Sequence, residues 1–244
     1  MQKRIANNES GFSMIELVVA MAVTLTIVGL ASSLLASSFN MRSREDRKSD
    51  AIADVQRALN IMTREISNSG LKLPSDLPSI SANGVVAGDS NNESIRIVSN
   101  LNGMPDSANG YFEDTDVTDA DEDLKFLMYV DADLGQRYIV RYERNGTNQT
   151  TVLANRIDSL MFRYYDEKVT YNTKINDEGN CDIENVVNAS GATENEVSPG
   201  SAKVVVIGVC VTLPAAGSPN TDGYQPPTQV QLTSDVVLRN TIVY

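Results

Sequence analysis

The sequence predicts an α+β fold in which a long N-terminal helix packs on an antiparallel β-sheet head. No proline occurs in residues 12–73, and apolar residues recur there at helical spacing. From Pro74 onward, short alternating runs and turn residues predict strands. We expect four parts, which are a leader over 1–11, an apolar helix over 12–39, its amphipathic continuation over 40–73, and a globular head over 74–244.

The first part of the helix is long and apolar enough to cross a bilayer. At about 1.5 Å per residue, residues 12–35 reach roughly 36 Å, against a hydrocarbon core of about 30 Å. Glu16 is the only charged residue in 12–41. Lys3 and Arg4 precede the span, so the positive-inside tendency places the N-terminus in the cytoplasm and the head outside.

Three interpretations of this segment compete. A cleaved secretory signal has an apolar stretch of about 7 to 15 residues, which is shorter than the one here and would not contain Glu16. A plain signal anchor gains nothing from a carboxylate that costs about 3 kcal/mol inside the span. The third interpretation rests on the combination of a glycine, an aromatic residue directly after it, Glu16 and the apolar span.

This combination, Gly-Phe-Ser-Met-Ile-Glu at 11–16, resembles the class III signal of type IV pilins and of the related type II secretion pseudopilins. The resemblance implies that a membrane-embedded prepilin peptidase cleaves between Gly11 and Phe12 on the cytoplasmic side. It also implies that Phe12 becomes the methylated first residue and that the fold is pilin-like.

Glu16 suits such a signal on physical grounds. After cleavage it would lie one helical turn from the free ammonium group of Phe12, where the helix dipole also favours negative charge. At about 4 Å and an effective dielectric constant near 20, the two charges attract by about 4 kcal/mol. This pair, within one subunit or between neighbours as the resemblance implies, would favour the correct axial register during assembly. The alternative is that Glu16 extends to the inner leaflet.

Beyond the span we expect the same helix to continue to about Ser67 and to end before Gly70 and Pro74. Its apolar stripe consists of Ile52, Val55, Leu59, Met62 and Ile66. The opposite face, which we expect to be exposed to solvent, consists of Asp54, Arg57, Arg64 and Glu65. The mixed charges of 42–50 favour a solvated helix face over a lipid-headgroup or partner site.

The head is predicted to be rich in strands. Residues 124–130 and 137–142 predict a hairpin, and 156–165 alternates as a strand does. Residues 202–213 are apolar on both faces and predict a central strand, with 229–244 as its neighbour. We expect the buried face of this sheet to pack on the apolar stripe of the helix.

Segments 54–57, 62–66, 160–165 and 236–240 resemble the PilW-type minor pilins and the J-type minor pseudopilins. The resemblance implies a structural subunit that helps to initiate type IV pilus assembly and lies at the tip. The alternatives are a minor pseudopilin of type II secretion and a pilus-tip module for binding or adhesion.

The resemblance also implies the partners and the location. The partners are major and minor pilins, the prepilin peptidase, the inner-membrane assembly platform, and membrane lipid before assembly. The location is the bacterial inner membrane, crossed once, and later the pilus at the cell surface.

Composition argues against other functions. The net charge of −12 disfavours nucleic acid, since neutralising phosphates requires a basic surface. The chain has no histidine to act as a base or metal ligand. It also has no phosphate-binding glycine loop and no Gly-x-Ser-x-Gly elbow, so we predict no enzyme activity and no cofactor.

The only two cysteines, Cys181 and Cys210, lie on the exported side, where a disulfide can form. It would attach the loop that we expect over 174–200 to the central strand. The alternative is a buried free Cys210 and an exposed free Cys181.

An acid-rich segment over 111–123 contains seven carboxylates. Oxygen ligands at alternating positions suit Ca²⁺, and the ligands to test are Asp114, Asp116, Asp119 and Asp121. The segment lacks the glycine and the terminal glutamate of an EF-hand loop, which favours an ordinary solvated loop.

Overall fold

The structure, a computed structural model, describes residues 13–73, 77, 79–101, 116–145, 149–215, 217, 219 and 224–239. The chain divides into two compact units. The N-terminal unit comprises Met1–Asp46 and Ala215–Pro226, and the head unit comprises Arg47–Pro214 and Pro227–Tyr244. Helix α1 (Met14–Ser67) contributes to both units as one unbroken helix of 54 residues, which confirms the predicted long helix.

Two glycines shape the end of α1. Gly70 has a φ of +77°, the left-handed conformation that commonly follows a helix end, and its N–H donates to the carbonyl of Val98 at 2.9 Å. Gly84 has a φ of +76°, and a Cβ placed there would come within 1.9 Å of the Gly70 nitrogen. The chain can therefore pass this closely only because both positions lack a side chain.

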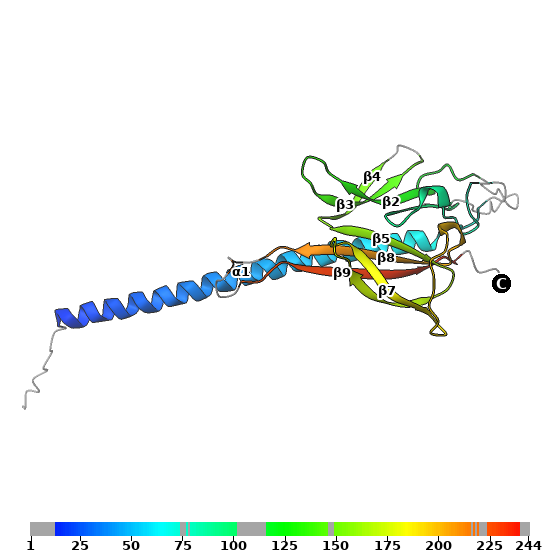
Figure 1. The fold of residues 1–244 in the computed structure, drawn as a ribbon. Coiled ribbons are helices and arrows are strands. Elements are labelled where there is room, and N and C mark those ends of the chain that lie inside the picture. Colours follow the sequence, from blue (N-terminus) through cyan, green and yellow to red (C-terminus); the bar gives the residue numbers. More distant parts are fainter. Residues whose placement is uncertain are drawn as a thin grey trace, which may run out of the picture. The chain divides into compact units, whose positions relative to one another are not determined.

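The head unit contains three antiparallel sheets (Figure 1). The first has the order β1-β2-β3-β4 and consists of β1 (Ser94–Val98), β2 (Asp123–Val130), β3 (Arg137–Glu143) and β4 (Thr150–Asn155). The second has the order β5-β8-β9 and consists of β5 (Ser159–Tyr165), β8 (Val204–Leu213) and β9 (Thr228–Val237). The third is the hairpin of β6 (Val169–Ile175) and β7 (Cys181–Asn188). Two short 3-10 helices are η1 (Ala87–Asp89) and η2 (Pro199–Ser201).

The predicted hairpin is confirmed as β2 and β3, and the predicted central strand is confirmed as β8, paired along its whole length with β9. Two expectations about strands in the head were wrong. The strand expected from Arg156 begins at Ser159, because Arg156 has a φ of +56°. The segment 174–200, expected to be a loop, contains β7.

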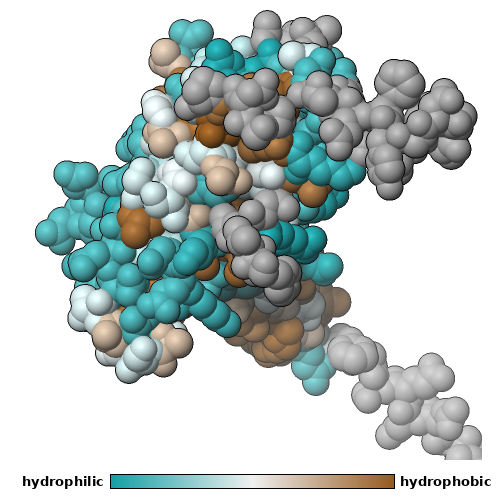
Figure 2. Space-filling model, turned by 90° about the vertical axis from the view of Figure 1, so that its right-hand side faces the viewer, coloured by the Kyte–Doolittle hydropathy of each residue, from teal (hydrophilic) through white to brown (hydrophobic). Residues whose placement is uncertain are grey.

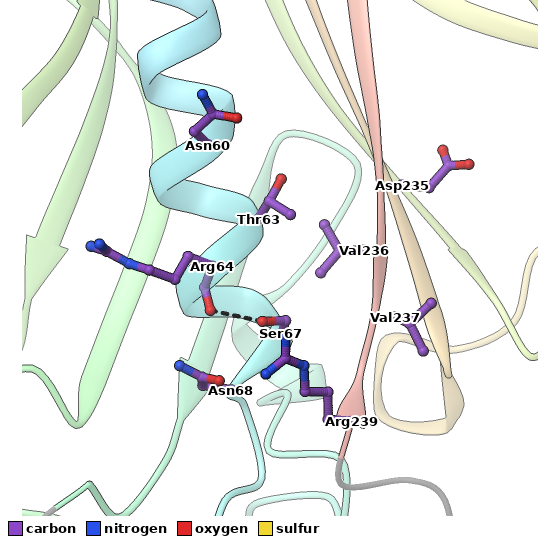
Figure 3. Close-up of a pocket in the computed structure, with 9 residues that line it drawn as sticks. All are labelled: Asn60, Thr63, Arg64, Ser67, Asn68, Asp235, Val236, Val237 and Arg239. Atoms are coloured by element: carbon purple, nitrogen blue, oxygen red, sulfur yellow. Dashed lines mark hydrogen bonds between the residues drawn. The ribbon is translucent and has the colours of Figure 1, made fainter.

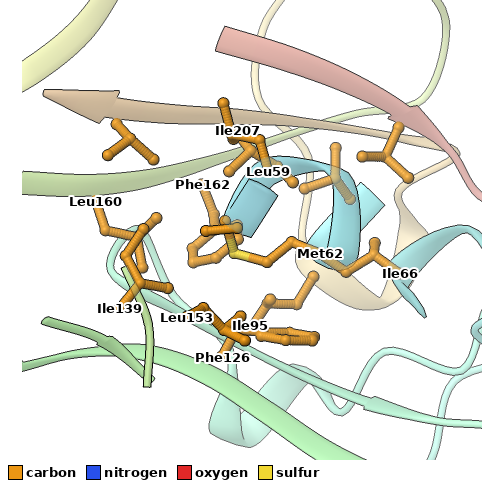
Figure 4. Close-up of a cluster of buried hydrophobic side chains, with 14 of the residues drawn as sticks. Leu59, Met62, Ile66, Ile95, Phe126, Ile139, Leu153, Leu160, Phe162 and Ile207 are labelled. Atoms are coloured by element: carbon orange, nitrogen blue, oxygen red, sulfur yellow. The ribbon is translucent and has the colours of Figure 1, made fainter. Parts of the chain in front are cut away.

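The main hydrophobic core contains side chains from α1, the first sheet and the second sheet (Figure 4). The helix contributes the buried stripe Val55, Leu59, Met62 and Ile66. Phe126 on β2 and Phe162 on β5, both fully buried, belong to the same cluster. The prediction that the apolar stripe packs on the sheet is therefore confirmed for these four residues, whereas the fifth, Ile52, is half-buried and lies outside the cluster.

Strand β8 is buried on both faces. Val205 and Ile207 belong to the main core beside α1, whereas Val204 and Val206 belong to a second cluster. Val169 of β6 belongs to the same second cluster, so the β6–β7 hairpin covers the opposite face of the second sheet. This explains why most residues of β8 are apolar, both those that point to one face of the sheet and those that point to the other.

Candidate functional site

The first candidate site is the N-terminal end of α1. The N–H of Ser13 donates to Oε2 of Glu16 at 2.9 Å, and the N–H of Leu17 donates to the Ser13 carbonyl at 3.3 Å. Ser13 thus precedes the first helical residue, and Glu16 reaches back to it as the glutamate of a capping box does. This role of Ser13 was not predicted, although the Ser-x-x-Glu spacing at 13–16 is a sequence signal for such a cap. Gly11 and Phe12 lie outside the described residues.

The helix that follows exposes an apolar surface within the N-terminal unit. Every large apolar side chain that the structure describes from Met14 to Met41 is between 53% and 87% exposed. The helix includes a segment long and apolar enough to cross a membrane. By contrast, hydrophilic residues predominate on the face of the head unit seen in Figure 2. An apolar surface of this extent indicates burial in lipid or against other proteins, and it is consistent with membrane anchoring.

Hydroxyl groups within this apolar segment bond to the helix itself. Thr24 donates to the carbonyl of Ala20 at 2.7 Å, and Thr26 donates to the carbonyl of Ala22 at 2.8 Å. Ser38 likewise donates to the carbonyl of Leu34 at 3.0 Å. Such bonds to the preceding turn satisfy a hydroxyl without water, so these three residues remain compatible with an apolar environment.

The polar segment 42–50 is mostly exposed, with Arg44 and Lys48 half-buried. Arg44 Nη2 donates to the Pro226 carbonyl at 3.1 Å, within the N-terminal unit. This bond attaches the connection between β8 and β9 to the polar segment of α1.

Cys181 and Cys210 form a disulfide in the structure, with their Cα atoms 5.5 Å apart. Both are buried. Cys181 is the first residue of β7, and Cys210 lies in β8. Next to the bridge, Gln231 of β9 donates to the Asp182 carbonyl at 2.9 Å. The disulfide therefore holds the β6–β7 hairpin on the face of the second sheet that is remote from α1.

In the described part of the acid-rich segment, carboxylates bind other groups of the head unit. Asp116 accepts hydrogen bonds from the N–H and the hydroxyl of Thr118 at 3.1 and 2.8 Å, and Asp121 forms an ion pair with Arg141. Buried Glu122 accepts from the N–H groups of Leu101 and Asp119. Asp114 lies outside the described residues. Ca²⁺ binding at the four aspartates stays an untested alternative to the predicted solvated loop.

Another group of carboxylates lies elsewhere in the head unit. Oxygen atoms of Asp166, Glu167 and Glu194 lie within 4.8 Å of one another. Desolvation, together with the negative charges of Asp166 and Glu167, raises the pKa of Glu194. Asn188 donates to both Glu167 and Glu194, at 2.8 and 3.3 Å, and this holds two of the three acids in place.

One residue expected on the exposed face of α1 is largely buried. Glu65 accepts a hydrogen bond from Nε of Arg141 on β3 at 2.9 Å, and the two side chains are 18% and 13% exposed. Although burial acts to lower it, the pKa of Arg141 is raised overall because Glu65 and Asp121 bind the charged guanidinium. The expected exposure of Glu65 was therefore wrong, because the first sheet covers this side of the helix.

A groove lies between the last turns of α1 and strand β9 (Figure 3). Its volume is about 420 Å³, and it is lined by Asn60, Thr63, Arg64, Ser67, Asn68, Asp235, Val236, Val237 and Arg239. One bridge crosses between the two walls, where the hydroxyls of Thr63 and Ser234 lie 3.1 Å apart. No pattern in the sequence predicted a groove between these two segments, since they lie far apart along the chain.

A family model described as the prokaryotic N-terminal methylation motif matches residues 6–32. No curated protein and no solved structure matches the chain. The matched residues include Ser13, Glu16 and the start of the exposed apolar surface. The chain is therefore an α+β protein with an N-terminal apolar helix and a type IV pilin-like prepilin signal, which supports the resemblance to pilins and pseudopilins.

Proposed function

We propose that this chain is a minor pilin, a structural subunit that helps to initiate the assembly of type IV pili and lies at the tip. One observation carries the proposal. Helix α1 exposes apolar side chains from Met14 to Met41, and Glu16 in the first helical turn is the only charged residue of that stretch. The methylation motif matches this same region.

The exposed apolar surface needs a partner at every stage. Burying one large aliphatic side chain is worth about 1.5 to 3 kcal/mol, so leaving this surface in water would be very costly. Membrane lipid covers it before assembly, and the helices of major and minor pilins cover it in the filament. Exchange of one apolar environment for the other keeps the hydrophobic cost of assembly small.

Glu16 then supplies the specificity that an apolar surface lacks. Its Oε2 accepts the Ser13 N–H, and a carboxylate has about four acceptor positions. The group can therefore cap its own helix and still bind the methylated ammonium of Phe12, in the same subunit or in a neighbour. Only the correct axial position of a subunit brings the two charges together.

This function defines a topology and a set of partners. The leader faces the cytoplasm, where the prepilin peptidase cleaves after Gly11, and the head unit faces outward. The inner-membrane assembly platform then moves the subunit from the membrane into the pilus at the cell surface. The proposed role is structural, without catalysis, cofactor or nucleic acid.

The first test is the N-terminus of the protein isolated from cells. Intact mass and N-terminal sequencing should show a chain that begins with methylated Phe12. Replacing Gly11 by valine should leave the leader attached, because the added side chain obstructs the cleaved bond. The neighbouring Ser10→Ala change is the control and should be processed normally. A wild-type protein that still begins at Met1 would rule out the proposal.

The second test is incorporation into filaments. Glu16→Ala should leave the amount of protein in the membrane unchanged but should reduce its presence in sheared filaments at least about tenfold, equivalent to about 1.4 kcal/mol. Glu45→Ala, which removes an exposed carboxylate further along α1, is the control. Equal incorporation of both variants would contradict the assembly role of Glu16.

Deletion of the gene separates the proposed function from its alternatives. If the deletion strain lacks surface filaments, and these filaments reappear when pilus retraction is blocked, the result supports a role in initiation. Normal filaments with lost adhesion support a binding module, and normal filaments with lost protein export support a pseudopilin. Immunogold labelling of the head unit should place it at pilus tips.

A further inference from the structure

The groove between α1 and β9 has a wall made of main chain. Asp235, Val236 and Val237 are consecutive residues of β9, and all three line it. Figure 3 shows Val236 pointing toward the helix, while Asp235 and Val237 point to the other side of the strand. Because alternate side chains point in opposite directions, a groove lined by three consecutive residues exposes the backbone of the strand.

Strand β9 is also an edge strand within the described part of the head unit. It pairs with β8 over ten residues without a register shift, and no described strand pairs with its other side. Proteins commonly protect such edges with lysine, proline or a bulge. None of these occurs in β9, whose sequence is TQVQLTSDVV. Its outer N–H and C=O groups can therefore accept another extended segment.

The charge around the groove favours an acidic segment. Arg64 and Arg239 are the two basic residues that line it. The side chain of Arg64 is 72% exposed, and its Nη2 lies 3.7 Å from Oε1 of Glu65, a long contact that leaves the guanidinium accessible to a ligand. Arg239 extends from the end of β9 toward Ser67 (Figure 3). The Asp235 side chain points to the other side of β9, away from the two arginines, and accepts a 2.6 Å hydrogen bond from the Tyr171 hydroxyl there.

We propose that the edge of β9 binds an extended, acidic segment of a partner protein, which adds a strand to the second sheet beside α1. Main-chain hydrogen bonds to β9 provide affinity, as in other cases of strand addition. Arg64 and Arg239 select carboxylate side chains, and the polar helix face of Asn60, Thr63 and Asn68 contacts the segment from the side. The site is independent of the apolar surface of α1 and goes beyond the filament role.

The test uses the full-length protein in detergent micelles and a fluorescent octapeptide of alternating valine and aspartate. Fluorescence anisotropy should show saturable binding that weakens as salt is raised, because salt screens exposed charges. An octapeptide of alternating valine and lysine should not bind. The acidic peptide with N-methyl groups on alternate residues should also fail, because it cannot donate the hydrogen bonds of a strand.

Variants of the protein test the two arginines. Arg64→Glu and Arg239→Glu should each weaken binding of the acidic peptide at least about fivefold. Arg57→Glu is the matched control, since Arg57 is an arginine of α1 outside the groove with a similar exposure, 67% against 72% for Arg64, and it should change affinity less than about twofold. Circular dichroism melts of each variant establish that the head unit remains folded.

Several results would overturn the proposal. These are the absence of saturable binding, equal binding of the lysine peptide or the N-methylated peptide, and full affinity in folded Arg64→Glu and Arg239→Glu proteins. Self-association of the protein in micelles that Arg239→Glu abolishes would also overturn it, because a second copy would then occupy the edge of β9.

Discussion

Glu65 in α1 and Arg141 on β3 form a largely buried ion pair, with 2.9 Å between Oε2 and Nε. Arg141 also contacts Asp121, and its Nη1 lies 3.8 Å from Glu143. The guanidinium thus joins the helix to the first sheet and to the end of the acid-rich segment. Its surroundings exclude most water, so each charge depends on its partner.

Removing one partner of this pair should destabilise the head unit. We expect Glu65→Ala to lower the free energy of unfolding by about 2 to 3 kcal/mol, less than for a fully buried pair because some exposure remains. Urea unfolding of the full chain in micelles, followed by near-ultraviolet circular dichroism, measures the change. Arg64→Ala, on the exposed face one residue earlier, is the control and should stay within about 0.5 kcal/mol. Equal effects of the two variants would contradict the coupling.

Glu65 also shows what sequence periodicity could and could not predict. The spacing of Val55, Leu59, Met62 and Ile66 correctly identified the stripe that enters the core. A prediction from periodicity assumes that the helix is buried along one stripe only, whereas α1 packs against both the first and the second sheet. The margin of the stripe is therefore buried by β3, and only the three-dimensional arrangement shows this.

Strand β7 was missed for a local reason. Polar residues interrupt its alternation, several of its side chains are exposed or half-buried, and Asn185 has a φ of +54°. Such a segment has the composition of a loop. The disulfide at its first residue and the cover it provides for β8 are tertiary features, as is the groove formed by α1 and β9. By contrast, the Ser-x-x-Glu cap of α1 is a local pattern that is present in the sequence, although we did not predict it.

The disulfide should contribute strongly to the stability of the head unit. Cys181 and Cys210 are separated by 29 positions, and closing a loop of this length is worth about 3–4 kcal/mol in the chain-entropy model. We expect the Cys181→Ala/Cys210→Ala double variant to lose an amount of this order in urea unfolding. Mass spectrometry of the wild type with and without reductant should show a difference of two hydrogens. An identical mass would show that the thiols are free.

Gly84 should tolerate no side chain. Gly84→Ala would force a Cβ to within 1.9 Å of the Gly70 nitrogen at a φ of +76°, and we expect a loss of more than about 2 kcal/mol. Gly88→Ala is a matched control, because a Cβ there meets nothing within 4 Å. The two variants can be compared by thermal melting in micelles. Similar melting temperatures would show that the chain around Gly70 relaxes without cost.

Asp89 should give the head unit a measurable dependence on acid pH. A hydrogen bond from Arg96 holds the pKa of Asp89 below its ordinary value of 3.8. The pKa of Asp89 is lower in the folded state than in the unfolded state. The ionised carboxylate therefore stabilises the folded head unit above pH 3.8, and this contribution is lost as the pH falls through the lowered pKa.

Asp89→Asn tests this dependence. Because Asp89 is 41% exposed, we expect a loss of at most about 1 kcal/mol at neutral pH. The difference from wild type should disappear in strong acid, where both folded and unfolded states are protonated. Asp133→Asn, in an exposed turn, should show no such trend. A pH-independent difference for Asp89→Asn would point to altered packing.

Helix α1 supplies both the apolar surface of the N-terminal unit and the buried stripe at the centre of the head unit. Tension along its axis would therefore pass through the hydrogen-bonded backbone directly into the protein interior, with no slack linker to stretch first. Resistance to pulling would then depend on the packing of the two sheets around Val55, Met62 and Ile66, so that the same buried contacts serve both mechanical strength and folding stability.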